Sequence, residues 1–145
     1  MVVSSFRSKV VFLDTSPLIY FIEGHSIYQN VLKKLFEAND NGAFTFITTT
    51  ITLMEVLVQP MRLHKNDLAE KYRDILLNAS GIEVHDITAE VAIKAAELRG
   101  EFNLKTPDAL QLATAIYYQA DYFLTNDTRL KNIAGIHVIT VPEIE

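Results

Sequence analysis

The sequence predicts an α/β protein in which helices cover both faces of a parallel sheet. Short apolar segments of strand length alternate with longer segments of helical period along the chain. The strand segments are apolar throughout, which is typical of strands that are buried on both faces. With 145 residues, 49% of them hydrophobic and 21% charged, the chain is expected to form one domain with a proper core.

Five strands are expected, each a short run rich in β-branched and aromatic residues. They cover residues 9–13, 43–48, 82–87, 121–125 and 136–141. Asp14 ends the first of these runs, and Asn126-Asp127 follow the fourth and begin a short helical turn. Connections between parallel strands should be right-handed crossovers.

Helix starts and ends are predicted from capping residues and stop signals. Ser16-Pro17 and Thr106-Pro107 should open the first and the last helix, because a hydroxyl caps a helix and proline suits its first position. The other helices are expected to start at Ser26, Thr49-Thr50, Asn66 and Thr88. Asn41-Gly42, Gly81 and Gly100 should mark ends, and Pro60 should end one helix or start its successor.

Composition excludes several classes of function. The chain has no cysteine, so disulfides, thiolate chemistry and thiolate-rich zinc sites are ruled out. Its histidines, which are His25, His64, His85 and His137, are scattered without the spacing of metal ligands. No apolar run approaches the length of a membrane span, and the first residues lack the features of a signal peptide. A cytoplasmic protein without a membrane role is therefore expected.

Four carboxylates are predicted to meet at one edge of the sheet. Asp14 closes the first strand and Asp127 follows the fourth by two residues, so both lie at the carboxyl edge. Helices in such folds run antiparallel to the strands, and their N-termini lie at the same edge. Asp108 is in the first turn of the last helix, and Glu55 is about one turn into the helix after the second strand. Ligands of open α/β sheets bind at this edge.

Each of these carboxylates also has an ordinary structural interpretation. Asp108 could stabilise its helix dipole by roughly 0.3–1 kcal/mol. Asp14 could cap a helix, Glu55 could point to solvent, and Asp127 could be a turn residue. Gathered at one edge, however, the four would repel one another unless a cation bound between them. A set of oxygen ligands without Cys or His suits Mg²⁺ or Mn²⁺ rather than zinc.

The net charge of −5 does not forbid a phosphate-bearing substrate. Without the four candidate carboxylates, 14 acidic residues remain against 13 Lys and Arg, so most of the excess negative charge belongs to the predicted site. Lys105 and Arg129 are nearest to the acids in sequence and are the best candidates for phosphate contacts. Lys33, Lys34, Lys65 and Lys131 are weaker candidates.

At these residues the chain resembles the PIN-domain family of metal-dependent nucleases, and within it the VapC-like toxin ribonucleases. The segments that carry the resemblance are FLDTSPLIY, TTTITLMEVL and TPDALQLATAIYYQADYFLTND, and it extends over residues 9–141. It implies a three-layer α/β/α sandwich with a central parallel sheet of about five strands. It also implies that Asp14, Glu55, Asp108 and Asp127 are the metal-binding acids, with Thr125 as a supporting hydroxyl. Residues 1–8 precede the usual start and are expected to be an N-terminal extension or disordered.

The function implied by this resemblance is an endoribonuclease, the toxin of a type II toxin–antitoxin pair. One or two Mg²⁺ or Mn²⁺ ions would lower the pKa of a bound water for attack on an RNA phosphodiester. Glu55 would be a ligand, an outer partner or a proton acceptor. An antitoxin partner and a homodimer are implied as well, and exposed apolar residues at 17–23 and 51–63 would mark the surface for either.

Two other functions stay open from the sequence. A non-catalytic PIN-like protein-interaction domain could retain the four acids as structural residues. An aspartate-based phosphohydrolase could use Asp14 as its nucleophile. Enzymes of the second kind usually need another Asp two residues after the first, where this chain has Ser16.

Overall fold

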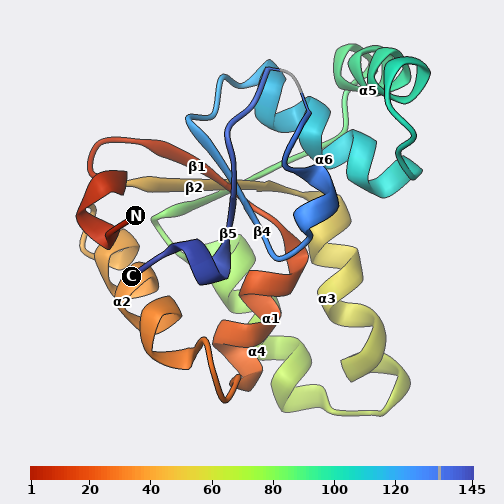
Figure 1. The fold of residues 1–145 in the computed structure, drawn as a ribbon. Helices are drawn as coiled ribbons and strands as arrows, with labels where there is room; N and C mark the ends of the chain where they lie inside the picture. Colours follow the sequence, from red (N-terminus) through yellow and green to blue (C-terminus); the bar gives the residue numbers. More distant parts are fainter. Residues whose placement is uncertain (134) are drawn as a thin grey trace.

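The computed structural model describes residues 1–133 and 135–145, and a parallel sheet lies at its centre (Figure 1). Within these residues the sheet has five strands in the order β3-β2-β1-β4-β5, every neighbouring pair parallel. The strands are β1 (Val10–Leu13), β2 (Thr45–Thr49), β3 (Ile82–His85), β4 (Tyr122–Thr125) and β5 (Val138–Thr140). The expected α/β class and the parallel sheet are thus confirmed, with strands one to three residues shorter than expected where their ends turn into loops or caps.

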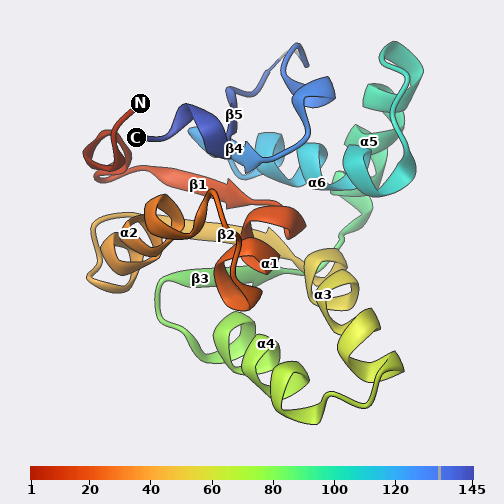
Figure 2. The ribbon, with the colours of Figure 1, turned by 60° about the horizontal axis from the view of Figure 1, so that its bottom comes forward.

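Helices cover the sheet on both sides and complete a three-layer sandwich (Figure 2). One face carries α1 (Thr15–Glu23), α2 (Gln29–Asp40), α3 (Thr50–Arg62) and α4 (Asn66–Asn78). The other face carries α5 (Ala89–Glu101) and α6 (Thr106–Tyr117), which pack closely against each other. None of the helices in the described part of the chain has the length and hydrophobicity that a membrane crossing requires.

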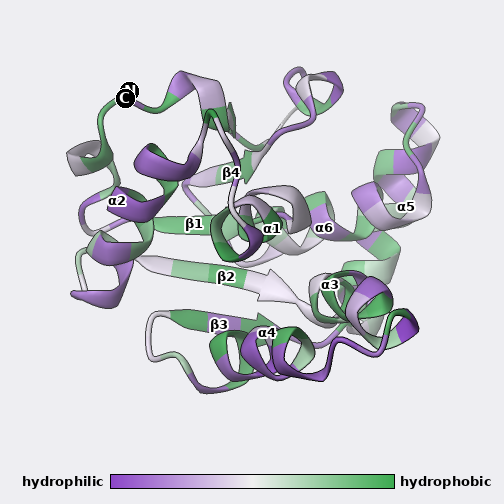
Figure 3. Ribbon diagram, turned by 90° about the horizontal axis from the view of Figure 1, so that it is seen from below, coloured by the Kyte–Doolittle hydropathy of each residue, from purple (hydrophilic) through white to green (hydrophobic). Residues whose placement is uncertain are grey.

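The two faces of the sheet have separate apolar cores. Val11 and Leu13 of β1 point into the core beneath α1, α2, α3 and α4, whereas Phe12 points into the core beneath α5 and α6. There Phe12 stacks on Phe123 of β4, with ring centroids 4.9 Å apart. Alternate residues of β1 therefore meet opposite layers, which explains why this central strand is apolar at every position. Figure 3 shows β1 mostly hydrophobic, while the carboxyl end of β2 is paler because it is formed by threonines.

Some capping residues were predicted correctly and others were not. Thr49 caps α3 and Thr88 caps α5, as expected, by accepting hydrogen bonds from the backbone of Ile51 and Val91. Asp14, not Ser16, caps α1: its carboxylate accepts from the backbone N–H of Thr15. Asp14 lies at the strand end and accepts from the first free backbone N–H, so the helix starts at Thr15, earlier than predicted.

Three other helix boundaries were also predicted wrongly. α2 starts at Gln29 rather than at Ser26. Pro60 lies inside α3, which continues to Arg62, and its ring is buried, so packing offsets the loss of one backbone donor. α5 passes through Gly100 to Glu101. Thr106 does not cap α6, because its hydroxyl accepts a hydrogen bond from Arg99 instead.

The first eight residues are part of the packed domain. Residues Val3–Phe6 form a 3-10 helix, and the Phe6 ring is fully buried against Phe44 and Tyr122. The N-terminal amine donates to the carbonyl oxygen of Glu143, at 2.8 Å. The two ends of the chain consequently lie side by side (Figure 1).

Candidate active site

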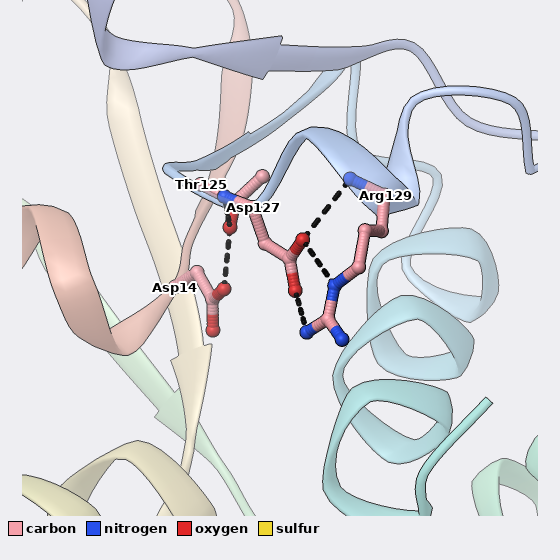
Figure 4. Close-up of polar contacts among 4 residues, drawn as sticks. All are labelled: Asp14, Thr125, Asp127 and Arg129. Carbon is pink, nitrogen blue, oxygen red and sulfur yellow. Dashed lines mark hydrogen bonds and ion pairs between the residues drawn. The ribbon is translucent and has the colours of Figure 1, made fainter.

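Asp14 is placed by the register of the two central strands. Leu13 of β1 pairs with Leu124 of β4, so Asp14 and Thr125 leave the sheet beside each other at its carboxyl edge. The Thr125 hydroxyl donates to Oδ2 of Asp14 at 2.7 Å and accepts from the backbone N–H of Asp127 at 3.1 Å (Figure 4). Thr125 is buried, and its hydroxyl links the carboxylate of Asp14 to the backbone of Asp127.

Glu55 reaches the same edge from α3. The Thr15 hydroxyl donates to Oε1 of Glu55 at 2.8 Å, while the Thr15 backbone N–H donates to Oδ1 of Asp14 at 2.9 Å. One threonine in the first turn of α1 therefore holds a carboxylate from β1 and one from α3. Thr15, through its hydroxyl and its backbone N–H, and Thr125, through its hydroxyl, connect Glu55, Asp14 and the backbone of Asp127 in one hydrogen-bonded series.

Electrostatic coupling brings Asp108 into the group. Burial raises the pKa of Asp14, and the carboxylates of Asp108 and Glu55 raise it further, against hydrogen bonds from Thr125 and Thr15 that lower it. Burial also raises the pKa of Asp108, as do the charges of Asp127 and Glu55. Each raised pKa reflects burial first and neighbouring negative charge second. The four predicted acids thus lie within electrostatic reach of one another at this edge of the sheet.

Asp127 differs from the other acids because it is paired with a cation. The guanidinium of Arg129 donates to both of its carboxylate oxygens, at 2.9 and 2.6 Å, as Figure 4 shows. This hydrogen-bonded pair lowers the pKa of Asp127. Asp127 also caps the following 3-10 turn, Thr128–Leu130, through the backbone N–H of Arg129, in the short helical turn that was expected here.

The donor chemistry of this site fits Mg²⁺ or Mn²⁺. Its four carboxylates offer only hard oxygen ligands, and the repulsion that raises the pKa of Asp14 and Asp108 would be relieved by a divalent cation. In the arrangement seen, no three Asp, Glu or His side chains of the described residues converge closely enough to hold an ion. Binding would require Asp127 to exchange its contact with Arg129 for the metal.

A buried polar network lies beneath these acids, and sequence reasoning missed it. Gln111 of α6 donates from Nε2 to the Thr52 hydroxyl at 2.7 Å, and it accepts from the Thr49 hydroxyl at 2.5 Å. Thr52 in turn bonds to Thr48, whose hydroxyl reaches the carbonyl oxygen of Leu13 at 2.8 Å. A polar glutamine within the apolar helix sequence ALQLATA was the one available signal.

This network joins the segments that carry three of the acids. Leu13 precedes Asp14, Thr52 is three residues before Glu55, and Gln111 is three residues after Asp108. All four side chains of the network, those of Thr48, Thr49, Thr52 and Gln111, are at most 2% exposed. Its hydrogen bonds therefore tie β1, the start of α3 and the first half of α6 to each other behind the site.

An open cavity of about 410 Å³ adjoins Asp108. Lys105 and Arg129, the two residues predicted as phosphate contacts, both line it. Arg99 lines it as well and was not singled out from the sequence, because it is separated from Asp108 by a loop whose path the sequence does not reveal.

Fold and site together define a protein with a five-stranded parallel sheet and an acidic cluster at the carboxyl edge of its central strands. A family model described as the PIN domain matches residues 11–136. The chain therefore belongs to the PIN domain family. A comparison with curated proteins gave no match.

Several solved structures with a similar fold are described as toxin–antitoxin complexes or as a toxin. A chain of VapBC2 from Rickettsia felis, solved with a promoter DNA fragment, has a TM-score of 0.73 at 22% identity, over 90% of this chain and 98% of that one. A chain of a toxin–antitoxin complex from Klebsiella pneumoniae has 0.68 at 28%, over 91% and 97%. VapC20 of Mycobacterium tuberculosis, described as a toxin that cleaves the sarcin–ricin loop, has 0.67 at 17%, over 88% and 98%. The expected resemblance to VapC-like proteins is confirmed at the level of fold and family.

Proposed function

We propose that this protein is a metal-dependent endoribonuclease that hydrolyses RNA phosphodiesters. The proposal is supported above all by hydrogen bonds of Thr15 and Thr125 that hold Asp14, Glu55 and the backbone of Asp127 at the carboxyl edge of a PIN fold, where the charges of Glu55 and Asp127 also act on Asp108. A role in helix stability alone would not require the acids to share one electrostatic site. RNA as the substrate is supported by VapC20, the sarcin–ricin loop cleaving toxin of similar fold.

Asp14, Asp108 and Asp127 would hold one or two Mg²⁺ or Mn²⁺ ions, with Glu55 as a further ligand, an outer partner or a proton acceptor. Such an ion supplies a bound water of lowered pKa and positive charge beside the departing oxyanion. The chain's own contribution is to fix its carboxylates: Thr125 orients Asp14, and Thr15 orients Glu55. Neither cysteine nor an organised Ser–His pair is needed, because water is the nucleophile.

A role as the toxin of a type II pair, with an antitoxin partner, is part of the proposal. It is supported by the similar chains in toxin–antitoxin complexes. On α3, Met54, Val58 and Met61 form an exposed apolar stripe at helical spacing, and Leu63 follows them in the exposed set. Such a surface suits the apolar side of an antitoxin helix or of a second copy in a homodimer.

The test is cleavage of a mixed single-stranded RNA pool. We expect cleavage with Mg²⁺ and none in EDTA or with the Asp108→Asn variant. Asp67→Asn is the control: Asp67 and Asp108 each lie in the first turn of a helix, α4 and α6, so both variants lose a similar helix-dipole contribution. Asp67 is exposed, whereas Asp108 is half-buried, so circular dichroism checks that the Asp108→Asn protein is folded.

Undiminished cleavage in EDTA, or by folded Asp108→Asn protein, would refute the proposal. The ion pair of Arg129 with Asp127 is the observation that favours the alternative, a non-catalytic PIN-like interaction domain. That alternative predicts no RNA cleavage under any of these conditions. An aspartate-based phosphohydrolase would instead hydrolyse small phosphoesters and leave RNA intact.

A further inference from the structure

The cavity beside Asp108 has a charge that the protein as a whole does not share. Its lining includes three cationic side chains, those of Arg99, Lys105 and Arg129, against the single carboxylate of Asp108. The whole chain, by contrast, has a net charge of −5. Arg129 is paired with Asp127, and Asp108 also lies in the lining, so two carboxylates offset part of this positive charge and the excess is left to attract an anion.

Arg99 is held toward the cavity by two hydrogen bonds. It lies in the last turn of α5, where its Nε donates to the carbonyl oxygen of Leu104 at 3.1 Å and one terminal nitrogen donates to the Thr106 hydroxyl at 2.9 Å. A guanidinium has five N–H donors, and these contacts use two of them. The others are left for a ligand, and the fixed side chain loses little conformational freedom when it binds one.

Lys105 and Arg129 face the same acids that the cavity adjoins. Both lower the pKa of Asp108 by their positive charge, and both also lower that of Asp127. Lys105 is the residue before α6, and Arg129 lies in the 3-10 turn after β4. The cations thus come from three separate segments, and Leu104 and Leu130 add apolar surface to the same lining.

We propose that this cavity binds a backbone phosphate of single-stranded RNA, and that Arg99 is a phosphate ligand together with Lys105 and Arg129. The inference rests on the proposed ribonuclease function, since it says where the protein would hold the RNA strand that is cleaved at the four carboxylates. A cavity of about 410 Å³ with apolar walls has room for a sugar beside the phosphate. The cations would hold the chain beside the carboxylates, so that the reacting phosphodiester is presented to them.

The experiment measures binding rather than cleavage. A fluorescently labelled short RNA of mixed sequence is titrated with protein in EDTA, where metal-dependent cleavage cannot proceed, over a range of salt concentrations. Each lost phosphate contact should reduce the slope of log affinity against log salt by about 0.7 for a single strand. Arg99→Gln and Lys105→Gln should each show this reduction together with weaker binding. Lys94→Gln is the control: Lys94 lies on α5 like Arg99 and pairs with Glu97.

The two charge variants separate binding from folding. Arg99→Gln also loses the contacts to Leu104 and Thr106, whereas Lys105→Gln removes a charge from the same cavity without disturbing them. Slopes for both variants equal to that of Lys94→Gln would overturn the phosphate site. Equally tight binding of a 5′-mononucleotide would overturn it as well, because the cavity would then take a small molecule rather than a chain.

The binding result and the cleavage result can fail independently. If RNA is cleaved with Mg²⁺ but the slopes are unchanged, the ribonuclease proposal stands and the phosphate site is refuted. If the slopes fall as expected but no RNA is cleaved, the phosphate site stands and the catalytic proposal fails.

Discussion

Replacing Gln111 by leucine should destabilise the protein by about 3–5 kcal/mol. The substitution removes the bond to Thr52 at 2.7 Å and the bond from Thr49 at 2.5 Å, and each buried hydrogen bond contributes about 1 kcal/mol. The Thr49 hydroxyl hydrogen is then left in a fully buried place without its acceptor, which costs a further ~1–3 kcal/mol. Leucine has a similar volume, so a cavity adds little.

Urea unfolding followed by circular dichroism measures this loss. We expect the midpoint to fall with little change in the denaturant slope, which indicates a change of stability rather than of the unfolded state. Gln59→Leu is the matched control: Gln59 is an exposed glutamine on α3, and exposed substitutions usually stay within about 0.5 kcal/mol.

A double-mutant cycle shows whether the network, and not the single residue, is responsible. Thr52→Val leaves the Gln111 amide without its acceptor, so each single variant should be costly. The double variant should cost less than the sum by about 0.5–3 kcal/mol, because the two side chains are bonded partners. A loss below about 1 kcal/mol for Gln111→Leu, or additive effects in the cycle, would refute the reasoning.

Three other substitutions probe packing, the acidic site and a surface carboxylate. Gly81→Ala should destabilise the protein by about 1–3 kcal/mol in thermal unfolding, because the added Cβ would lie 2.6 Å from the Asn39 side chain; an unchanged melting temperature would contradict this. Asp14→Asn should raise stability in EDTA, because burial raises the pKa of Asp14 and so makes its charged form costly in the folded protein. Mg²⁺ at about 100 times its Kd should stabilise the wild type by ~2.7 kcal/mol, and the variant should lose this stabilisation. Equal Mg²⁺ stabilisation of both proteins would count against Asp14 as a ligand. Glu143→Gln should cost at most ~1 kcal/mol at neutral pH, because Glu143 is exposed. Hydrogen bonds, first of all from Lys131, lower the pKa of Glu143 to about 2, so the difference should vanish as the pH falls from 4.5 toward 2; a constant difference across that range would exclude this cause.

The sheet could be predicted from sequence because its signal is local. Val10–Leu13 is apolar at every position and Tyr122–Thr125 at all but its last, and their strand character needs no knowledge of the rest of the chain. The meeting of the acids followed from one topological rule, that strand ends and helix starts share an edge in parallel folds. Asp14 and Asp108 could be placed there without any side-chain detail.

Helix starts were harder to predict because several donors and acceptors compete for them. Thr106 has the right residue type for a cap, but its hydroxyl accepts a hydrogen bond from the guanidinium of Arg99, seven positions earlier in the chain. Ser16 likewise loses its capping role to Asp14, which stands two residues before it. A capping rule describes one segment, whereas the outcome depends on which side chains tertiary structure brings near it.

Arg129 shows what a sequence cannot reveal about an electrostatic site. Its nearness to Asp127 suggested a phosphate contact, and it does line the cavity beside Asp108. The same guanidinium, however, donates to both oxygens of Asp127, one of the four candidate ligands. A metal ion at Asp127 and a phosphate in the cavity would therefore act together. The metal ion would displace the Arg129 guanidinium from the Asp127 carboxylate, and the phosphate would accept hydrogen bonds from the N–H groups that this frees. A sequence gives the two charges, and only the fold shows that Arg129 both pairs with Asp127 and lines the cavity beside Asp108.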